Sequence, residues 1–238
     1  MTSNHHTDEV FRKKRIIKNP IKFKIQLNEE QKEAKAKILD NTLTILAGKA
    51  GSGKTLLACN VALDGLLRRH YGKIIITRPT VSKEEIGFLP GDLREKMDPW
   101  IQPIYQNMYA LYDKEKVEKL ITDGKIEIVP LAFMRGRTFL DSCIIVDEAQ
   151  NVTHEQMEMI ATRIGLRSKM IVCGDDHQVD LKSRRESGFR FLYSAARKIK
   201  KMCSVTLLTN HRDPIVDSLI EVYEDATTRG ATLDSSGS

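Results

Sequence analysis

Apolar residues in this chain gather in short uninterrupted runs, separated by longer stretches in which apolar and polar residues mix. The runs predict β-strands at residues 43–47, 74–77, 126–129, 143–146, 170–173 and 205–208. Because the runs do not alternate with polar residues, both faces of each strand are expected to be buried. Strands of this type are typical of parallel sheets that helices cover on both faces.

The mixed stretches between the runs have the spacing of helices with one apolar face. They predict helices at residues 29–39, 55–69, 99–112, 154–164, 188–199 and 214–223. Asn28 stands immediately before the first of these and is a typical N-cap residue. Strands and helices therefore alternate along the chain, which predicts an α/β fold with a parallel sheet flanked by helices on both faces.

The charge of the chain is unevenly distributed. Its formal net charge is +6, and most of the excess lies in residues 1–26. We interpret this segment as a basic, flexible arm, residues 27–226 as one domain, and residues 227–238 as a polar tail that frays. The arm is suited either to neutralising nucleic-acid phosphates or to serving as a solvated lead-in, and its composition does not separate the two.

The composition also excludes several classes of protein. With 41% hydrophobic and 29% charged residues, the chain resembles a soluble globular protein. No run approaches the roughly 18 apolar residues of a membrane span, and the N-terminus lacks the apolar segment of a secretory signal. The 4 cysteines form no C-x-x-C pair. We expect them to be reduced core residues of a cytoplasmic protein rather than metal ligands or disulfides.

The loop after the first predicted strand matches the pattern G-x-x-x-x-G-K-[ST]. Its residues are Gly48, Lys49, Ala50, Gly51, Ser52, Gly53, Lys54 and Thr55. Between a strand and a helix, such a loop turns consecutive backbone N–H groups toward phosphate oxygens, and the helix N-terminus adds partial positive charge. Lys54 is expected to reach the β- and γ-phosphates, and Thr55 to hold Mg²⁺. The loop therefore predicts a nucleotide site.

The predicted strand at residues 143–146 ends in two acidic residues, Asp147 and Glu148. Asp147, at the strand tip, is expected to hold Mg²⁺ through water, and Glu148 is expected to polarise an attacking water. The second acid favours hydrolysis of ATP by water. The sequence contains no N-K-x-D motif for reading guanine, which argues against GTP.

Three further residues are candidates for contacts with the nucleotide. Gln178, in the stretch "GDDHQ" after the strand at residues 170–173, is placed to contact the γ-phosphate or the attacking water. Gln31 is a candidate for reading the adenine edge, or an ordinary exposed helix residue. Arg212, after the last strand, is a candidate for the γ-phosphate of its own or a neighbouring subunit, or a partner in a structural salt bridge.

Together these motifs resemble the PhoH family of P-loop ATPases, whose core is similar to the first RecA-like lobe of superfamily 1 helicases. The resemblance covers roughly residues 26–224, and its most specific blocks are "GFLPGDLREKMDP" and "AFMRGRTF". Trp100 and Asp213 stand where the family often has Tyr and His, so any role of that His does not carry over. Some members carry a PIN nuclease domain before the ATPase. The segment before the core here is too short for one, which implies a short bacterial or bacteriophage type.

The family-specific blocks contain further candidates for binding. Arg78 and Lys83 follow the second predicted strand, in a loop whose equivalent touches the nucleic-acid backbone in helicase-like cores. They are candidates for phosphate contacts, or the loop is purely structural and its "FLPG" packs a turn. The aromatic residues of the segment 100–112 have helical spacing, which favours a core or subunit interface over stacking on bases. Arg135 and Arg137 flank a glycine and are candidates for binding single-stranded nucleic acid or a neighbour's nucleotide.

The resemblance implies an ATPase that uses ATP and Mg²⁺ and works as a homo-oligomer, with a hexameric ring suspected because a single RecA-like lobe leaves half of the nucleotide exposed. Three outputs are open. The first is a translocase or helicase on single-stranded RNA or DNA, and the second is an ATP-switched assembly that acts on protein partners. The third, a kinase for a small metabolite, is disfavoured because no Arg-rich lid insertion is evident.

Overall fold

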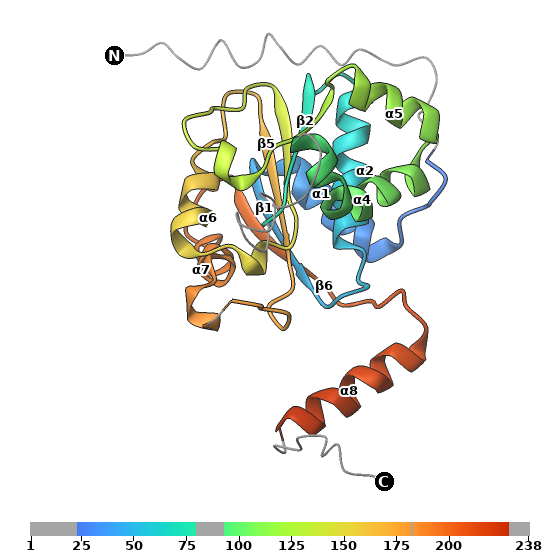
Figure 1. Cartoon of the computed structure of the whole chain (residues 1–238), viewed down its shortest axis with the longest axis vertical. Coiled ribbons are helices and arrows are strands. Elements are labelled where there is room, and N and C mark those ends of the chain that lie inside the picture. Colours follow the sequence, from blue (N-terminus) through green and yellow to red (C-terminus); the bar gives the residue numbers. More distant parts are fainter. Residues whose placement is uncertain (1–22, 80–92, 182, 229–238) are drawn as a thin grey trace.

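The computed structural model describes residues 23–79, 93–181 and 183–228, and these residues form one six-stranded sheet in the order β3-β2-β4-β5-β1-β6 (Figure 1). All neighbouring strands are parallel. The strands are β1 (Leu43–Gly48), β2 (Lys73–Thr77), β3 (Ile126–Ile128), β4 (Ser142–Val146), β5 (Lys169–Gly174) and β6 (Met202–Leu207). All six predicted strands are confirmed, and one strand, β5, separates the P-loop strand β1 from the acidic strand β4, in agreement with the expected RecA-like fold.

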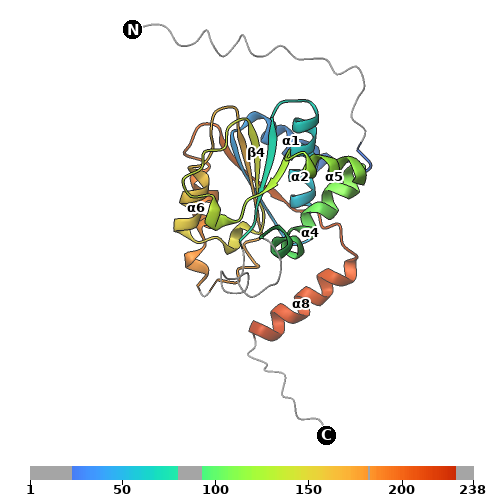
Figure 2. The same cartoon turned by 45° about the horizontal axis from the view of Figure 1, so that its top comes forward.

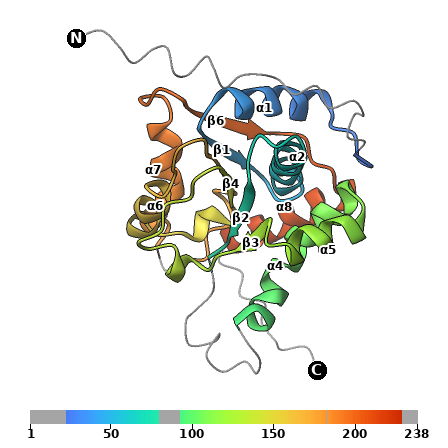
Figure 3. The same ribbon diagram turned by 90° about the horizontal axis from the view of Figure 1, so that it is seen from above.

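Helices cover both faces of the sheet, as the buried strands require. They are α1 (Glu29–Asp40), α2 (Lys54–Leu67), α4 (Leu93–Leu111), α5 (Lys114–Thr122), α6 (His154–Ala161), α7 (Gly188–Ala195) and α8 (Pro214–Thr228). Figure 3 shows α6 and α7 on one side of the sheet and α2, α4 and α5 on the other. Short 3₁₀ turns lie at η1 (Leu131–Phe133), η2 (Ala149–Asn151) and η3 (Arg184–Glu186).

Alternate residues of each strand enter two separate hydrophobic cores. Ile45 and Ile144 pack under α6 and α7, whereas Leu46 and Ile145 pack under α1, α2 and α4. This is the period-two alternation of a strand, hidden in the sequence because both faces are apolar. The two cores hold the sheet rigidly, so the loops at its carboxyl edge are positioned by well-packed strands.

The predicted helices are confirmed, with α4 beginning earlier than expected. Asn28 caps α1: its side chain accepts from the Gln31 backbone N–H at 2.7 Å, while the Gln31 side chain accepts from the Asn28 N–H at 3.2 Å. In α4, Ile104, Tyr105 and Met108 are buried, so the aromatic segment serves the core, as the spacing favoured.

Helix α5 was not expected from the sequence, because few of its residues are apolar. Asp113 caps it by accepting from the Lys116 backbone N–H at 3.1 Å, and only Val117 and Ile121 are buried. Residues 23–26, which the sequence interpretation assigned to the arm, include Phe23, whose ring meets that of Tyr112 edge-on at 6.2 Å. The end of that segment therefore packs on the domain, and residues 1–22 lie outside the described part of the chain.

The cysteines occupy the positions that the sequence predicted. Cys59, Cys143 and Cys173 are buried free thiols, and Cys203 is a partly exposed one. No helix in the described part of the chain is both long and apolar enough to cross a membrane.

Candidate nucleotide-binding site

The carboxyl ends of β1, β4 and β5 meet at one cavity of about 760 Å³. Ligands bind at this edge of parallel sheets because the loops that follow the strands gather there. Its wall includes residues of the P-loop, both acids after β4, the segment after β5 and the segment after β6. The volume lies within the range of cavities that hold ligands of nucleotide size.

The P-loop has the backbone geometry of a phosphate cradle. Gly51 and Gly53 have φ angles of 86° and 81°, in the left-handed region that favours glycine. Gly53 is the N-cap of α2, and no side chain caps that helix. The first N–H groups of α2 have no acceptor within their own helix, so an anion such as a phosphate fits this end.

Lys54 lies across the P-loop. Its ammonium group donates to the backbone oxygens of Gly48 at 2.6 Å and Lys49 at 2.9 Å. The side chain is thus positioned beside the cradle, with both contacts to neutral carbonyl groups. A phosphate offers a charged acceptor, which forms the stronger hydrogen bond.

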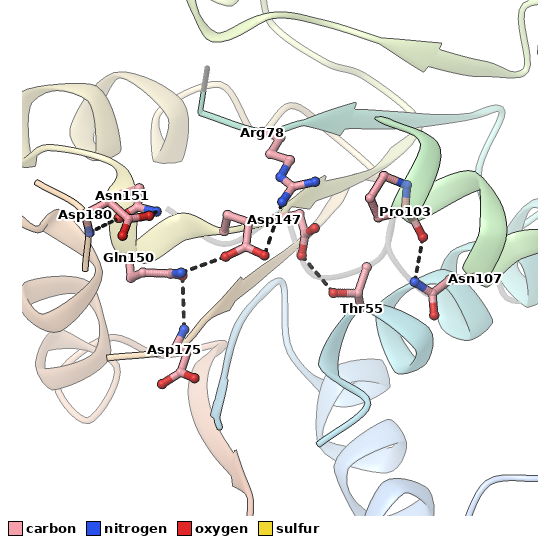
Figure 4. Close-up of polar contacts among 10 residues, drawn as sticks. Thr55, Arg78, Pro103, Asn107, Asp147, Gln150, Asn151, Asp175 and Asp180 are labelled. Carbon is pink, nitrogen blue, oxygen red and sulfur yellow. Dashed lines mark hydrogen bonds and ion pairs between the residues drawn. The ribbon is translucent and has the colours of Figure 1, made fainter. Parts of the chain in front are cut away.

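Thr55 and Asp147 both line the cavity and contact each other (Figure 4). The Thr55 hydroxyl donates to an Asp147 carboxylate oxygen at 2.8 Å. Asp147 is buried, and this burial, together with the Glu148 carboxylate, raises the pKa of Asp147 despite the opposing effects of Thr55 and Arg78. A hydroxyl and a buried carboxylate are oxygen ligands of the kind that Mg²⁺ prefers, so the pair fits the metal.

Glu148 is held beside the cavity by two partners. Its backbone has a φ angle of 51°, an uncommon conformation for a residue with a side chain. One carboxylate oxygen accepts from Arg78 at 3.3 Å and the other from Gln150 Nε2 at 2.7 Å. The Glu148 side chain is 38% exposed and lines the cavity, so water in the cavity can reach it.

Gln150 links the candidate base to the P-loop, a connection that sequence reasoning missed. Figure 4 shows its amide beside Asp175, and its Oε1 accepts from the Asp175 backbone N–H at 3.0 Å. The Asp175 carboxylate in turn accepts from the backbone N–H of Ala50, in the P-loop, at 2.8 Å. Both Gln150 and Asp175 are buried, so this chain of hydrogen bonds is shielded from water.

The signal for this link was present in the sequence but indirect. Gln150 follows the two acids in "DEAQ", and Asp175 precedes Gln178 in "GDDHQ". Each side chain is short and polar, and a Gly-Asp turn after a strand is common. Only the adjacency of β4 and β5 brings the two motifs within hydrogen-bonding distance.

The other predicted nucleotide contacts also line the cavity. Gln178, Gln31 and Arg212 all contribute to its wall. Gln31 is only 3% exposed, so the alternative that it is an ordinary exposed helix residue is wrong. Its Nε2 lies 3.4 Å from His211 Nε2. Arg212 packs its side-chain carbons close to Gly51 of its own P-loop, so it stands at its own subunit's cavity. Their contacts with a nucleotide remain predictions.

The described candidate nucleic-acid residues each form an ion pair with a different acidic residue. Arg78 reaches the site itself, through its ion pair with Glu148. Arg135 pairs with Glu155 at 3.6 Å, and Arg137 pairs with Glu127 at 2.8 Å and stacks over the ring of Phe139. Neither of these two arginines lines the described cavity. Lys83 lies outside the described residues.

Comparison with known proteins places the chain in a family. Residues 24–235 match the family described as PhoH-like protein. The chain belongs to the PhoH family. It is 42% identical over 190 residues to the PhoH-like protein of Synechocystis sp. and 43% identical over 197 residues to that of Bacillus subtilis. It is 40% identical over 157 residues to protein PhoH of Escherichia coli.

These PhoH relatives are longer than the matched region. The alignments cover 79% of this chain and 58% of the Synechocystis protein, 82% and 62% for Bacillus subtilis, and 65% and 44% for Escherichia coli. The chain thus spans between 44% and 62% of their length. The family match at residues 24–235 includes all of the residues that line the nucleotide cavity.

Solved helicase structures show a more distant likeness. The Pif1 helicase of Candida albicans aligns with a TM-score of 0.44 at 16% identity, covering 84% of this chain and 44% of that one. The UvsW helicase of bacteriophage T4 aligns with a TM-score of 0.45 at 14% identity, covering 78% and 61%.

Proposed function

We propose that this PhoH-family protein is an ATPase that hydrolyses ATP with Mg²⁺ and Glu148 as general base. The observation that carries this is the meeting of three groups at one cavity: the P-loop with Lys54, the Thr55–Asp147 pair, and Glu148. A phosphate cradle alone serves many reactions. Glu148 is a second acid beside Thr55 and Asp147, and it is accessible to water. An acid in this position can activate a water molecule, which is what hydrolysis requires.

The roles of the residues follow from their positions. The P-loop N–H groups and Lys54 hold the β- and γ-phosphates. Mg²⁺, when bound, neutralises phosphate charge and would be held by Thr55 and, through water, by Asp147. Glu148 accepts a proton from a water whose oxygen attacks the γ-phosphorus. The bond from that phosphorus to the β–γ bridging oxygen breaks, and ADP and phosphate leave.

Arg78 and Gln150 act on Glu148 rather than on the phosphates. Their hydrogen bonds hold the Glu148 carboxylate in place beside the cavity. Gln178 and Arg212 are proposed to contact the γ-phosphate or the attacking water, since both line the same cavity. Gln31 is proposed to meet the adenine through its Nε2, because its Oε1 already accepts from Asn28.

We further propose that the ATP cycle serves single-stranded RNA or DNA, and that the protein works as an oligomeric ring. Two features support the first part: the excess of basic residues in the sequence of segment 1–26, and the position of Arg78 directly after β2, where it pairs with Glu148 of the site. In such a ring a neighbouring subunit would stand beside the cavity at the carboxyl edge of the sheet. Arg135 and Arg137, both away from their own cavity, are candidates to act on a neighbour or on the nucleic acid.

The test compares ATP turnover with and without poly-RNA and single-stranded DNA, at low and moderate salt. Stimulation that weakens as salt rises supports a nucleic-acid motor, because phosphate contacts release counterions. Replacing both Arg135 and Arg137 with Ala should then abolish the stimulation and leave the basal rate unchanged. A rate that no polymer changes would favour the second candidate, an ATP-switched assembly acting on protein partners.

A further inference from the structure

The segment between β6 and α8 is fastened to α1 and to the P-loop. Figures 1 and 2 show it passing beside the loop that joins β1 to α2. The backbone N–H groups of Leu208 and Thr209 donate to the two carboxylate oxygens of Glu30, at 2.6 and 3.2 Å. The His211 N–H donates to Gly51 O at 3.1 Å. These bonds fix the position of His211 at the wall of the nucleotide cavity.

The His211 imidazole faces two side-chain amides. Its Nε2 lies 3.4 Å from Asn28 Nδ2 and 3.4 Å from Gln31 Nε2, and all three residues line the cavity. An amide nitrogen can only donate, so Nε2 of the imidazole is the acceptor and the ring proton lies on Nδ1. His211 therefore holds two amino groups at one point of the cavity wall.

The capping box of α1 decides which way both amides face. Asn28 Oδ1 accepts from the Gln31 backbone N–H, and Gln31 Oε1 accepts from the Asn28 backbone N–H. Because each oxygen is held by a backbone donor, each amino group points to the other side, where His211 lies. The helix cap thus presents two donors, and no rotation of the amides exchanges them for acceptors without breaking the cap.

The two donors are not fully used by the protein. Contacts of 3.4 Å are longer than an ordinary N–H hydrogen bond, and both amino groups share the single lone pair of Nε2. Gln31 is nearly buried, so water does not readily complete its bonds. An acceptor atom carried by a ligand would satisfy these groups better than His211 alone.

The amide pair lies on the outer side of the P-loop. Gly51 turns its carbonyl oxygen toward His211, and a Cβ atom built on Gly53 would come within 2.6 Å of Gln31 Nε2. The phosphate cradle is formed by the N–H groups of the same loop, which point to its inner side. Because phosphates are held there, the part of a bound nucleotide that can reach the amides is the base.

Two other amides line the cavity, those of Gln26 and Asn107. Each donates to a backbone oxygen of its own segment, Phe23 O at 3.3 Å and Pro103 O at 2.8 Å. Neither is joined to His211. Their side-chain oxygens remain available as acceptors, which suits the amino group that adenine and guanine each carry.

We infer that His211 sets base recognition by holding the amino groups of Asn28 and Gln31 toward N7 of a purine. Adenine and guanine both carry N7 as an acceptor, whereas pyrimidines have no such atom. The substrates are therefore purine nucleoside triphosphates, GTP as well as ATP. The missing N-K-x-D motif does not conflict, because N7 is common to both purines. The inference rests on the proposed function and names its class of substrate.

The experiment measures how nucleotides compete with a fluorescent ATP analogue for the full chain in Mg²⁺. The probes are ATP, GTP, CTP and 7-deaza-ATP, in which a C–H group replaces N7. We expect 7-deaza-ATP to bind about 5-fold more weakly than ATP, the usual worth of one hydrogen bond. GTP should compete within about tenfold of ATP, and CTP should bind more weakly than both.

Four variants assign the effect to the amide pair and His211. Gln31→Glu keeps the capping box, because Glu serves at this position of the helix, but replaces the donor with an acceptor. His211→Ala removes the acceptor, and His211→Gln restores one. His70→Ala, an exposed histidine at the amino edge of the sheet, is the matched control. We expect Gln31→Glu and His211→Ala to bind ATP and 7-deaza-ATP equally, and the other two to keep the difference.

A purely structural role for His211 would give a different result. It would weaken binding of inorganic triphosphate, which has no base, and would lower the thermal unfolding midpoint. We expect both to be unchanged in His211→Ala, with a raised KM for ATP and a similar kcat. Three results would overturn the inference: wild type that binds ATP and 7-deaza-ATP equally, GTP that does not compete, or His211→Ala that weakens triphosphate binding.

The competition measurement does not depend on hydrolysis. A wild-type protein that distinguishes ATP from 7-deaza-ATP but hydrolyses neither would overturn the proposed ATPase and leave the base recognition in place. A protein that hydrolyses both with the same kcat/KM would do the reverse.

Discussion

A charged side chain is buried at each of the two edges of the sheet, and the two side chains have different roles. At the carboxyl edge, Asp147 is buried beside a second carboxylate, Glu148, which raises its pKa. At the amino edge, the Lys169 ammonium is buried and donates to the backbone oxygens of Ile38, Leu39 and Asn41 at the end of α1. Burial lowers the pKa of Lys169, so this charge also has a cost.

The difference lies in what satisfies each charge. Lys169 donates to carbonyl groups at the C-terminal end of α1, where the helix itself supplies few N–H donors, so the buried charge stabilises the fold. Asp147 accepts hydrogen bonds from the Thr55 hydroxyl and the Glu148 backbone N–H and lies near Arg78, but burial and the Glu148 carboxylate still raise its pKa. A bound cation would offset that remaining repulsion. The comparison teaches that the amino edge is built for stability and the carboxyl edge for ligand binding.

The largest effect is expected at the carboxyl edge, from Lys54→Ala. The attraction between the Lys54 ammonium and the transferred phosphoryl group grows as negative charge develops on that group. Without this attraction, turnover should fall about 10²- to 10³-fold. Nucleotide affinity should fall as well. Steady-state ATP hydrolysis and equilibrium binding of a fluorescent ATP analogue measure both. An unchanged turnover would show that Lys54 does not contribute to ATP hydrolysis.

The next effect is expected from Gln150, which holds Glu148 without facing the phosphates. Gln150→Ala removes a hydrogen bond to a charged group, worth about 1.5–3 kcal/mol, and should reduce kcat by roughly 10- to 150-fold while leaving the KM for ATP similar. A change confined to KM would show that Gln150 shapes the pocket instead of positioning the base.

At the amino edge, Lys169→Met should lower the free energy of unfolding by about 1–3 kcal/mol, because buried carbonyls at the end of α1 lose their donor. Lys201→Met is the matched control, since that exposed lysine donates to Asp40 O of the same helix at 3.2 Å. It should change stability little. Urea titration measures both variants, and equal losses would contradict a special role for the buried lysine.

The smallest effect, of opposite sign, is expected from Asp147→Asn. Because the pKa of Asp147 is raised in the folded state, ionisation of this group destabilises the fold as pH rises through that pKa. In EDTA without nucleotide, the Asn variant should therefore be slightly more stable than wild type at neutral pH. The advantage should disappear below pH about 3.9, where Asp is protonated in both states. Thermal unfolding across this pH range measures the difference.

Much of this architecture could be predicted from the sequence because it is encoded locally. The buried strands, the Asn28 cap and the P-loop each depend on residues close together in the chain. Asp147 and Glu148 were recognisable because they end a buried strand. Helix α5 was not predictable by the same logic, since its apolar face consists of little more than Val117 and Ile121.

What the sequence could not reveal depends on contacts between distant segments. The link from Glu148 through Gln150 and Asp175 to Ala50 requires β4, β5 and β1 to be neighbours. The ion pair between Arg78 and Glu148 joins residues 70 positions apart. Lys169 looked like an ordinary residue at a strand boundary, and only the packing of α1 on the sheet shows what it holds.

The most direct test of the account is ATP turnover by Glu148→Gln at saturating Mg²⁺ and ATP, with nucleotide affinity measured on the same protein. The amide keeps the shape of the side chain but cannot accept the proton. The account predicts a loss of turnover of about 10²- to 10⁴-fold, the usual contribution of a general base, with ATP affinity preserved. Turnover close to that of wild type, at unchanged affinity, would contradict the assignment of Glu148 as the base.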